Sequence, residues 1–237
     1  MKIQKKITKK KTRESESSLP CYKVVILGKN EIGKTQLLHR FNSENFVKEY
    51  YPTFGVDYRI KEIIDEKTKK HTCDIQMIEI AGEKDKIHLD IEKDIINTTH
   101  AFICVFTLED ETSVFDAVNL KKEYQEKIGE FTDRSKRKWF LIGTKKDLGS
   151  DEKTLPPQFK EKFDNYYEVS SKESRQEEFD KIISGISHKL NKTMKDYKFV
   201  NIDEDKENEP FEIDFEQAHK DLLHQKSEQL WHIYHYE

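Results

Sequence analysis

The chain has 237 residues and a formal net charge of −4, with 35% hydrophobic and 37% charged residues. This length suits one domain with extensions, and the near-balanced charge argues against nucleic acid as a partner. The longest apolar run, about residues 101–106, is far too short for a membrane helix. Three cysteines far apart in the sequence argue against a disulfide framework and favour a reducing compartment.

Both ends of the chain differ in composition from its centre. The stretch Lys2–Arg13 holds seven Lys or Arg and no acidic residue, so we expect residues 1–19 to be a basic arm without regular structure. Residues 203–216 carry eight acidic side chains and one lysine. We therefore expect a globular domain over residues 20–199, followed over 200–237 by an acidic linker and an amphipathic helix.

The roles of these ends stay open on the sequence. The basic arm could contact an anionic membrane weakly, carry a nuclear-targeting signal, or be a solvated segment without function. The C-terminal helix could fold back on the domain or bind a partner. The last cysteine is Cys104, so we expect no prenyl anchor. We expect a cytoplasmic protein, with peripheral membrane contact or a nuclear location through the arm as alternatives.

The hydrophobic pattern predicts strands that alternate with helices. We expect strands over residues 22–28, 56–64, 71–80, 101–107, 138–143 and 166–169. We expect helices over residues 35–41, 112–128, 156–163 and about 179–190. In the second helix, Phe115, Val118, Tyr124 and Ile128 are spaced to lie on one side. The pattern favours a mostly parallel sheet with helices on both faces and one antiparallel hairpin, with ligands at the carboxyl ends of the strands.

A phosphate-binding motif follows the first strand. Residues 28–35 fit G-x-x-x-x-G-K-[ST], between a strand and a helix, as the motif requires. The glycines let successive N–H groups point at phosphate oxygens, Lys34 can reach the β- and γ-phosphates, and the Thr35 hydroxyl can bind Mg²⁺. The alternative is a chance Gly-Lys turn before a helix. The residues that we expect to contact the nucleotide here are Gly28, Asn30, Glu31, Ile32, Gly33, Lys34, Thr35 and Gln36.

Four further loops follow in order along the chain. They are Tyr-Pro-Thr-Phe-Gly-Val-Asp at 51–57, Glu-Ile-Ala-Gly-Glu at 79–83, Thr-Lys-Lys-Asp at 144–147 and Ser-Ser-Lys at 170–172. Together with the phosphate loop, this set resembles the small Ras-like GTPases, with the Rab type nearest, over roughly residues 21–199. The resemblance implies a P-loop G domain with a six-stranded sheet that binds GTP or GDP with Mg²⁺.

The resemblance also implies roles for individual residues. Metal ligation falls to Thr35, Thr53 and Glu79, and the γ-phosphate contacts to Thr53 and Gly82. Nucleotide base contacts fall to Phe46, Thr144, Lys145, Asp147, Ser170, Ser171 and Lys172. For Asp147 the chemistry supports this independently: one carboxylate accepts both the N1–H and the N2 amine of guanine, whereas N1 of adenine is an acceptor and is repelled.

The sequence departs from the family pattern at three positions. Glu79 replaces an Asp that holds Mg²⁺ through water, and the longer side chain implies either weaker metal binding or a shifted strand end. Glu83 replaces the Gln that orients the attacking water, and Asn30 replaces a small residue. We therefore expect slow GTP hydrolysis, with Lys34, Gly82 and Glu83 as the catalytic group.

The function that we expect is a GTP/GDP switch in signalling or vesicle traffic. Its partners would be protein effectors and exchange or activating factors. One alternative is a pseudo-GTPase scaffold that binds nucleotide without turnover or not at all. Another is an ATP-using P-loop enzyme, against which Asp147 argues.

Overall fold

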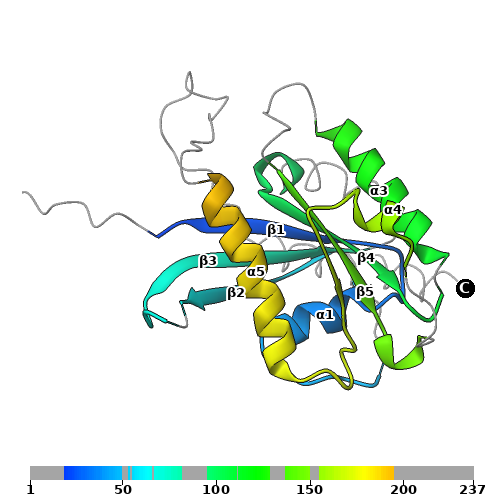
Figure 1. Cartoon of the computed structure of the whole chain (residues 1–237), viewed down its shortest axis with the longest axis horizontal. Helices are drawn as coiled ribbons and strands as arrows, with labels where there is room; N and C mark the ends of the chain where they lie inside the picture. Colours follow the sequence, from blue (N-terminus) through cyan, green and yellow to red (C-terminus); the bar gives the residue numbers. More distant parts are fainter. Residues whose placement is uncertain are drawn as a thin grey trace, which may run out of the picture.

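A computed structural model of the chain (Figure 1) describes residues 19–49, 53, 55–65, 67–81, 95–110, 112–128, 137–149 and 155–194. The basic stretch and residues 200–237 lie outside this part of the chain, as do Gly82 and Glu83. The elements are β1 (Cys21–Leu27), α1 (Lys34–Phe41), β2 (Val56–Ile64), β3 (His71–Ile80), β4 (Ala101–Thr107), α3 (Ser113–Lys127), β5 (Lys138–Thr144), the 3-10 helix η2 (Lys146–Leu148), α4 (Pro157–Lys160), β6 (Asn165–Glu168) and α5 (Gln176–Met194).

The described strands form one six-stranded sheet in the order β2-β3-β1-β4-β5-β6. β2 runs antiparallel to β3, and every other neighbouring pair is parallel. The predicted fold class is therefore confirmed, and each strand begins and ends within one residue of its prediction. The runs of β-branched and aromatic residues identified these strands because a parallel sheet covered on both faces needs apolar side chains at successive positions.

Two hydrophobic clusters lie on the two faces of the sheet. Val24 and Ile26 of β1 belong to the cluster under α1 and α5, and Val25 and Leu27 to the one under α3 and α4. Figure 1 shows α5 crossing in front of β1 with α1 beside it. In α5 the predicted apolar stripe is buried, and its Phe179 meets Phe41 of α1 edge to face, with ring centroids 6.0 Å apart.

The predicted orientation of the helix before β5 was wrong in one respect. Phe115 of α3 is 57% exposed, whereas Val114, Ala117 and Tyr124 are buried. The buried stripe thus begins one residue earlier than expected. The ring of Phe115 instead contacts Phe159 of α4 edge to face, at 5.1 Å between centroids.

The predicted helix over residues 156–163 is shorter in the structure. α4 ends at Lys160, because the chain must turn there to bring β6 alongside β5. Asp164 fixes this turn from both its backbone and its side chain. Its N–H donates to the Trp139 carbonyl at 2.7 Å, and its carboxylate accepts from the Trp139 N–H at 2.8 Å.

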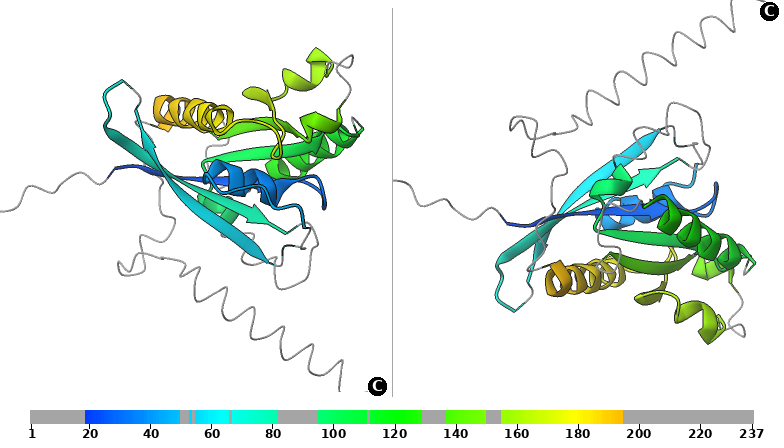
Figure 2. Two further views of the ribbon diagram at one scale, coloured as in Figure 1. Left: turned by 90° about the horizontal axis from the view of Figure 1, so that it is seen from below. Right: turned by 90° about the horizontal axis from the view of Figure 1, so that it is seen from above.

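The β2–β3 hairpin is the one antiparallel part of the sheet. Figure 2 shows it as a twisted ribbon whose turn lies beyond the end of α5. Asp65 stabilises the turn, because its carboxylate accepts from the N–H groups of Lys67 at 3.1 Å and Thr68 at 2.6 Å. Among the described helices none is long and apolar enough to cross a lipid bilayer.

Candidate functional site

The phosphate-binding motif forms the loop between β1 and α1. Gly33, directly before α1, has φ of 93°, a conformation that glycine adopts at little cost. At Gly28 an added Cβ would lie 3.0 Å from the Val105 carbonyl oxygen and closer still to the Ile32 side chain. Both positions therefore need glycine. The loop brings the unpaired N–H groups at the start of α1 to the carboxyl edge of the sheet, where they can bind an anion.

Lys34 lies across this loop. Its side chain is buried, and its Nζ donates to the backbone carbonyl of Lys29 at 2.8 Å. Burial lowers the pKa of this ammonium group, while the carboxylate of Glu79 acts in the opposite direction. A buried cation held by the backbone of this loop at the start of α1 is suited to binding phosphate oxygens.

Three oxygen-bearing side chains meet beside Lys34. Thr35 Oγ1 lies 2.9 Å from Thr53 Oγ1 and donates to Glu79 Oε1, also at 2.9 Å. Glu79 is only 1% exposed, and burial raises the pKa of its carboxyl to about 7, although the Lys34 charge opposes this. Its second oxygen, Oε2, is buried and has no hydrogen-bond partner among the described residues.

This arrangement fits Mg²⁺, which prefers oxygen ligands. Two hydroxyls and one carboxylate from α1, β3 and the loop before β2 are together, and one buried carboxylate oxygen lacks a donor. Within the described ranges no group of three or more His, Cys, Asp and Glu forms a metal site of its own. The three side chains would therefore hold the ion jointly with phosphate oxygens of a ligand.

The loop after β5 contacts the phosphate loop directly. Thr144 Oγ1 is within hydrogen-bonding distance of the carbonyl oxygens of Ile32 and Phe106, the latter at 3.0 Å. The side chain of Ile32 is buried in the core, so only its backbone can contact a ligand. Lys145 has a positive φ of 54°, and its Nζ pairs with Glu109 at 2.8 Å. The residues predicted for phosphate and for base thus lie at one edge of the sheet.

Asp147 is fixed by the loop after β6. Ser170 Oγ donates to Asp147 Oδ1 at 2.6 Å and in turn accepts the Glu173 N–H at 2.9 Å. Ser171 is buried, whereas Lys172 is exposed and pairs with its neighbour Glu173 at 3.7 Å. The Ser-Ser-Lys segment therefore positions the carboxylate that we predict to select the base.

Two predicted contacts lie in the segment after α1. Gln36 uses its side chain within the protein, because its Oε1 accepts the Val47 N–H at 3.0 Å. This bond holds the loop that carries Phe46, a residue that is 38% exposed. Asn30 and Glu31 are exposed in the phosphate loop, and Glu31 has a positive φ of 65°.

Sequence reasoning missed two ion pairs near the site. Lys29 of the phosphate loop pairs with Asp116 of α3 at 2.8 Å, and no local pattern could have indicated this contact. Asp57 lies opposite Glu79 in the β2–β3 ladder and pairs with Arg59 at 2.5 Å. This second pair had a signal, since residues two apart in a strand share a face.

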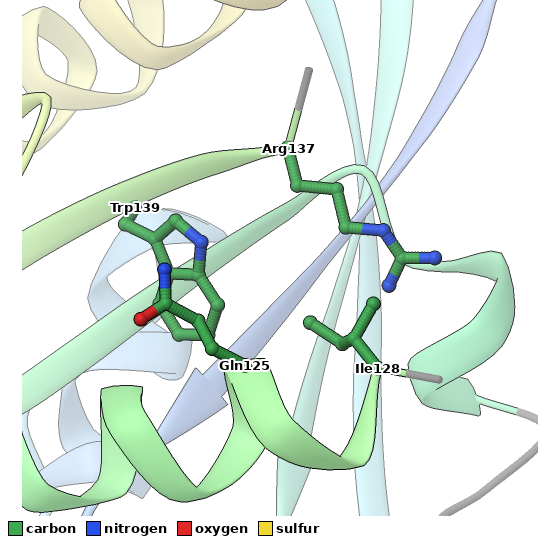
Figure 3. A pocket seen from close by; sticks show the side chains of 4 residues that line it. All are labelled: Gln125, Ile128, Arg137 and Trp139. Carbon is green, nitrogen blue, oxygen red and sulfur yellow. The ribbon is translucent and has the colours of Figure 1, made fainter. Parts of the chain in front are cut away.

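A separate cavity of about 250 Å³ lies at the other edge of the sheet. Figure 3 shows Gln125 in the last turn of α3 and Ile128 directly after it, with Arg137 directly before β5 and Trp139 in its second position. The Arg137 guanidinium donates to the Ile96 carbonyl at 2.6 Å. This cavity contains none of the predicted site residues.

Comparison with known proteins places the chain in a family. The family model described as "Ras family" matches residues 23–192. The chain is 32% identical to the Ras-related protein RabV of Dictyostelium discoideum over 132 residues, which are 54% of this chain and 52% of that protein. It is 29% identical to the Ras-related protein O-RAL of Diplobatis ommata over 136 residues, 57% and 61% of the two chains. It is 31% identical to the Ras-like protein rasB of Dictyostelium discoideum over 127 residues, 54% and 59% of the two chains.

The match spans about half to three fifths of the length of these relatives. Within the chain itself, the family match runs from β1 to the last turns of α5 and includes every loop described above. By its fold, the order of its loops and this match, the chain belongs to the Ras family of small GTPases.

Proposed function

We propose that this protein is a guanine-nucleotide switch that binds GTP or GDP together with Mg²⁺. The observation that carries the proposal is the meeting of Thr35, Thr53 and Glu79 beside the buried Lys34, at the sheet edge that also holds Asp147. Lys34 and the first N–H groups of α1 would bind the phosphates. Mg²⁺ held by the three oxygen-bearing side chains would neutralise phosphate charge.

The choice of guanine would fall to Asp147. The hydroxyl of Ser170 fixes this carboxylate by donating to Oδ1. The carboxylate can then accept hydrogen bonds from the two adjacent donors of guanine. Loss of the γ-phosphate would remove the ligand shared by the loops at Thr53 and Gly82 and would release both. Protein effectors would read that difference, and exchange and activating factors would control it.

The test is a titration of the purified full chain with fluorescent GDP, GTP and ATP in the presence of Mg²⁺. We expect saturable binding of both guanine nucleotides and none of ATP. Lys34→Ala and Asp147→Ala should each abolish the signal, whereas Lys181→Ala, an exposed site on α5, should leave it unchanged. A signal that survives both site variants, or no signal with wild type, would contradict the proposal.

We further propose that hydrolysis is slow, because Glu83 replaces an amide with a carboxylate that can only accept a hydrogen bond. Glu83→Gln would restore a donor to the transition state. One added hydrogen bond of about 1 kcal/mol corresponds to roughly five- to tenfold in rate. Single-turnover hydrolysis of preloaded GTP measures this, and a rate that is unchanged or lower in the variant would argue against the proposal. Nucleotide binding without turnover in both proteins would favour the scaffold alternative.

The basic stretch Lys2–Arg13 supports a weak contact with anionic membranes, at about 1 kcal/mol for each basic residue near such a surface. Flotation with acidic liposomes at low and high salt tests this. We expect binding at low salt that is lost at high salt. If the protein floats to the same extent with neutral as with acidic liposomes, the membrane proposal is wrong. The stretch would then be a solvated arm or a nuclear-targeting segment.

A further inference from the structure

Glu79 is the position where this chain departs most clearly from its family at the metal site. We propose that Glu79 binds Mg²⁺ directly through a carboxylate oxygen, replacing the water molecule that stands between the ion and the shorter Asp of the family. This inference rests on the proposed nucleotide function and concerns how the same site holds its ion.

The backbone at Glu79 cannot retreat to make room for the longer side chain. Glu79 is paired on both sides, with Ile26 of β1 and with Asp57 of β2. Two residues further on, the Ala81 N–H still donates to the Gly55 carbonyl at 2.9 Å. The strand end is therefore held in the ladder, and the additional methylene of Glu extends the carboxylate farther toward Thr35.

The two carboxylate oxygens of Glu79 have different surroundings. Oε1 accepts a hydrogen bond from Thr35 Oγ1, so the oxygen of that hydroxyl can accept from Thr53 or bind a metal ion. Oε2 is buried without a hydrogen-bond partner among the described residues. Buried carboxylate oxygens are normally paired or bound to a cation, so Oε2 is the atom available to the ion.

The spacing of the two hydroxyl oxygens agrees with a common ion. Neighbouring ligands of an octahedral Mg²⁺, each at about 2.0–2.1 Å, are about 2.9 Å apart. The hydroxyls of Thr35 and Thr53 are 2.9 Å apart. Thr35 Oγ1 lies 2.9 Å from Glu79 Oε1, which brings the carboxylate that carries Oε2 beside these hydroxyls. The neighbouring carboxylate of Asp57 is engaged by Arg59 at 2.5 Å, which leaves Glu79 as the acidic ligand.

The number of water molecules on the ion tests the proposal. Mn²⁺ replaces Mg²⁺ in the GDP complex of the full chain, and ¹⁷O-water broadening of its EPR lines counts the bound waters. We expect wild type to carry one water fewer than Glu79→Asp, whose shorter side chain readmits the bridging water. Equal counts in the two complexes would overturn direct binding by Glu79.

A second measurement detects the carboxylate ligand itself. In wild type labelled with δ-¹³C glutamate, a directly bound carboxylate should give a strong ¹³C hyperfine coupling to Mn²⁺, and Glu79→Gln should remove it. A weak coupling of the size given by an intervening water would contradict the proposal. Fluorescent GDP binding is measured beforehand with Mg²⁺ present: no binding by wild type overturns the proposed function itself, whereas binding with equal water counts overturns only the direct ligation.

Discussion

The Asp147 carboxylate, which we propose selects the base, is held by the hydroxyl of Ser170. The hydroxyl of Ser170 holds Oδ1 of Asp147 at 2.6 Å, and this hydroxyl is itself fixed by the Glu173 N–H. A carboxylate fixed in this way keeps its accepting geometry before the base arrives. The cost of ordering the side chain on binding is thereby reduced.

Asp147→Asn should exchange guanine for xanthine. An amide keeps one acceptor for N1–H but presents a donor to position 2, where guanine has an amine and xanthine a carbonyl oxygen. The variant loses the charged hydrogen bond from the carboxylate and places the amide NH₂ against the 2-amine of guanine. Together these changes cost at least about 2.7 kcal/mol, or roughly 100-fold in GDP affinity. Competition of fluorescent GDP with GDP and XDP measures this. Ser170→Ala, which retains the Asp147 carboxylate, should weaken GDP binding without strengthening XDP binding.

His100 is a half-buried histidine whose ring stays neutral near pH 7 in the folded protein. Its Nδ1 accepts the Lys23 N–H at 3.0 Å, so the proton of the neutral ring is on Nε2. Burial lowers the pKa of His100 to about 4, and the charges of Lys23 and Arg137 act in the same direction. Between this pKa and the ordinary value near 6.5, the unfolded state binds more protons, so the His100 contribution to stability falls as pH falls.

We expect His100→Asn, whose amide oxygen can replace Nδ1 as acceptor, to lose less stability on acidification than wild type. The difference between the two proteins should change by about 2 kcal/mol between pH 7 and pH 5. Urea unfolding at both pH values measures it. The comparison is needed because Glu79, with its pKa raised to about 7, gains stability over the same range and would flatten the wild-type profile. A difference that is independent of pH would contradict the assignment.

At the scale of elements, Lys61 joins three of them. It lies on β2, its Nζ donates to the carbonyl of Phe41 at the end of α1 at 2.8 Å, and it contacts Asp180 of α5 at 2.6 Å. The lysine side chain is 19% exposed. A cation at the C-terminal end of a helix is favourable, and removing it would leave a carbonyl oxygen without this donor.

Lys61→Met should therefore destabilise the domain by about 1–2 kcal/mol, although its apolar stem is retained. The control is Lys181→Met on the exposed side of α5, which should change stability by less than about 0.5 kcal/mol. Thermal unfolding of the two variants and wild type separates these outcomes. Equal midpoints for all three proteins would show that the contacts of Lys61 contribute nothing measurable.

The sequence predicted where strands and helices lie better than it predicted which side of each helix is buried. Strands such as β4, with seven successive buried residues, have a pattern that only a two-sided burial explains. In α3 the pattern was ambiguous, because Val114 and Phe115 are adjacent and both apolar, so either could face the sheet. Which of them faces the sheet is decided by packing against Phe159, a contact 44 positions along the chain that no local period encodes.

At the scale of the whole molecule, the loops were predictable and the contacts between them were not. Each motif after a strand could be placed at one sheet edge because parallel strands bring their carboxyl ends together. That Thr144 would contact the Ile32 carbonyl, or that Lys29 would pair with Asp116, depends on distances between elements set by side-chain packing. The segment with Gly82 and Glu83 lies outside the described residues, so its roles stay predictions.

Because the site joins β1, α1, β3, β5 and β6, its ligand should stabilise the whole domain. At a GDP concentration 100 times Kd, with Mg²⁺, binding adds about 2.7 kcal/mol, which corresponds to a rise in Tm of roughly 5–10 °C. Differential scanning fluorimetry measures this. EDTA should reverse most of the shift, and ATP at the same concentration should give none. A shift of equal size with ATP would contradict guanine selection.

The register of the β2–β3 hairpin has a mechanical consequence. Val56 pairs with Ile80 and Asp57 with Glu79. The loop with Thr53, which precedes β2, and the loop that follows β3 therefore leave the sheet at the same residue pair. The Ala81 N–H also donates to the Gly55 carbonyl at 2.9 Å, so the pairing continues one step beyond β2. We therefore expect a displacement of one loop to be transmitted to the other. A partner that binds along the outer edge of β2 would thus displace Glu79, the proposed acidic ligand of the ion, and Thr53 together, not one without the other.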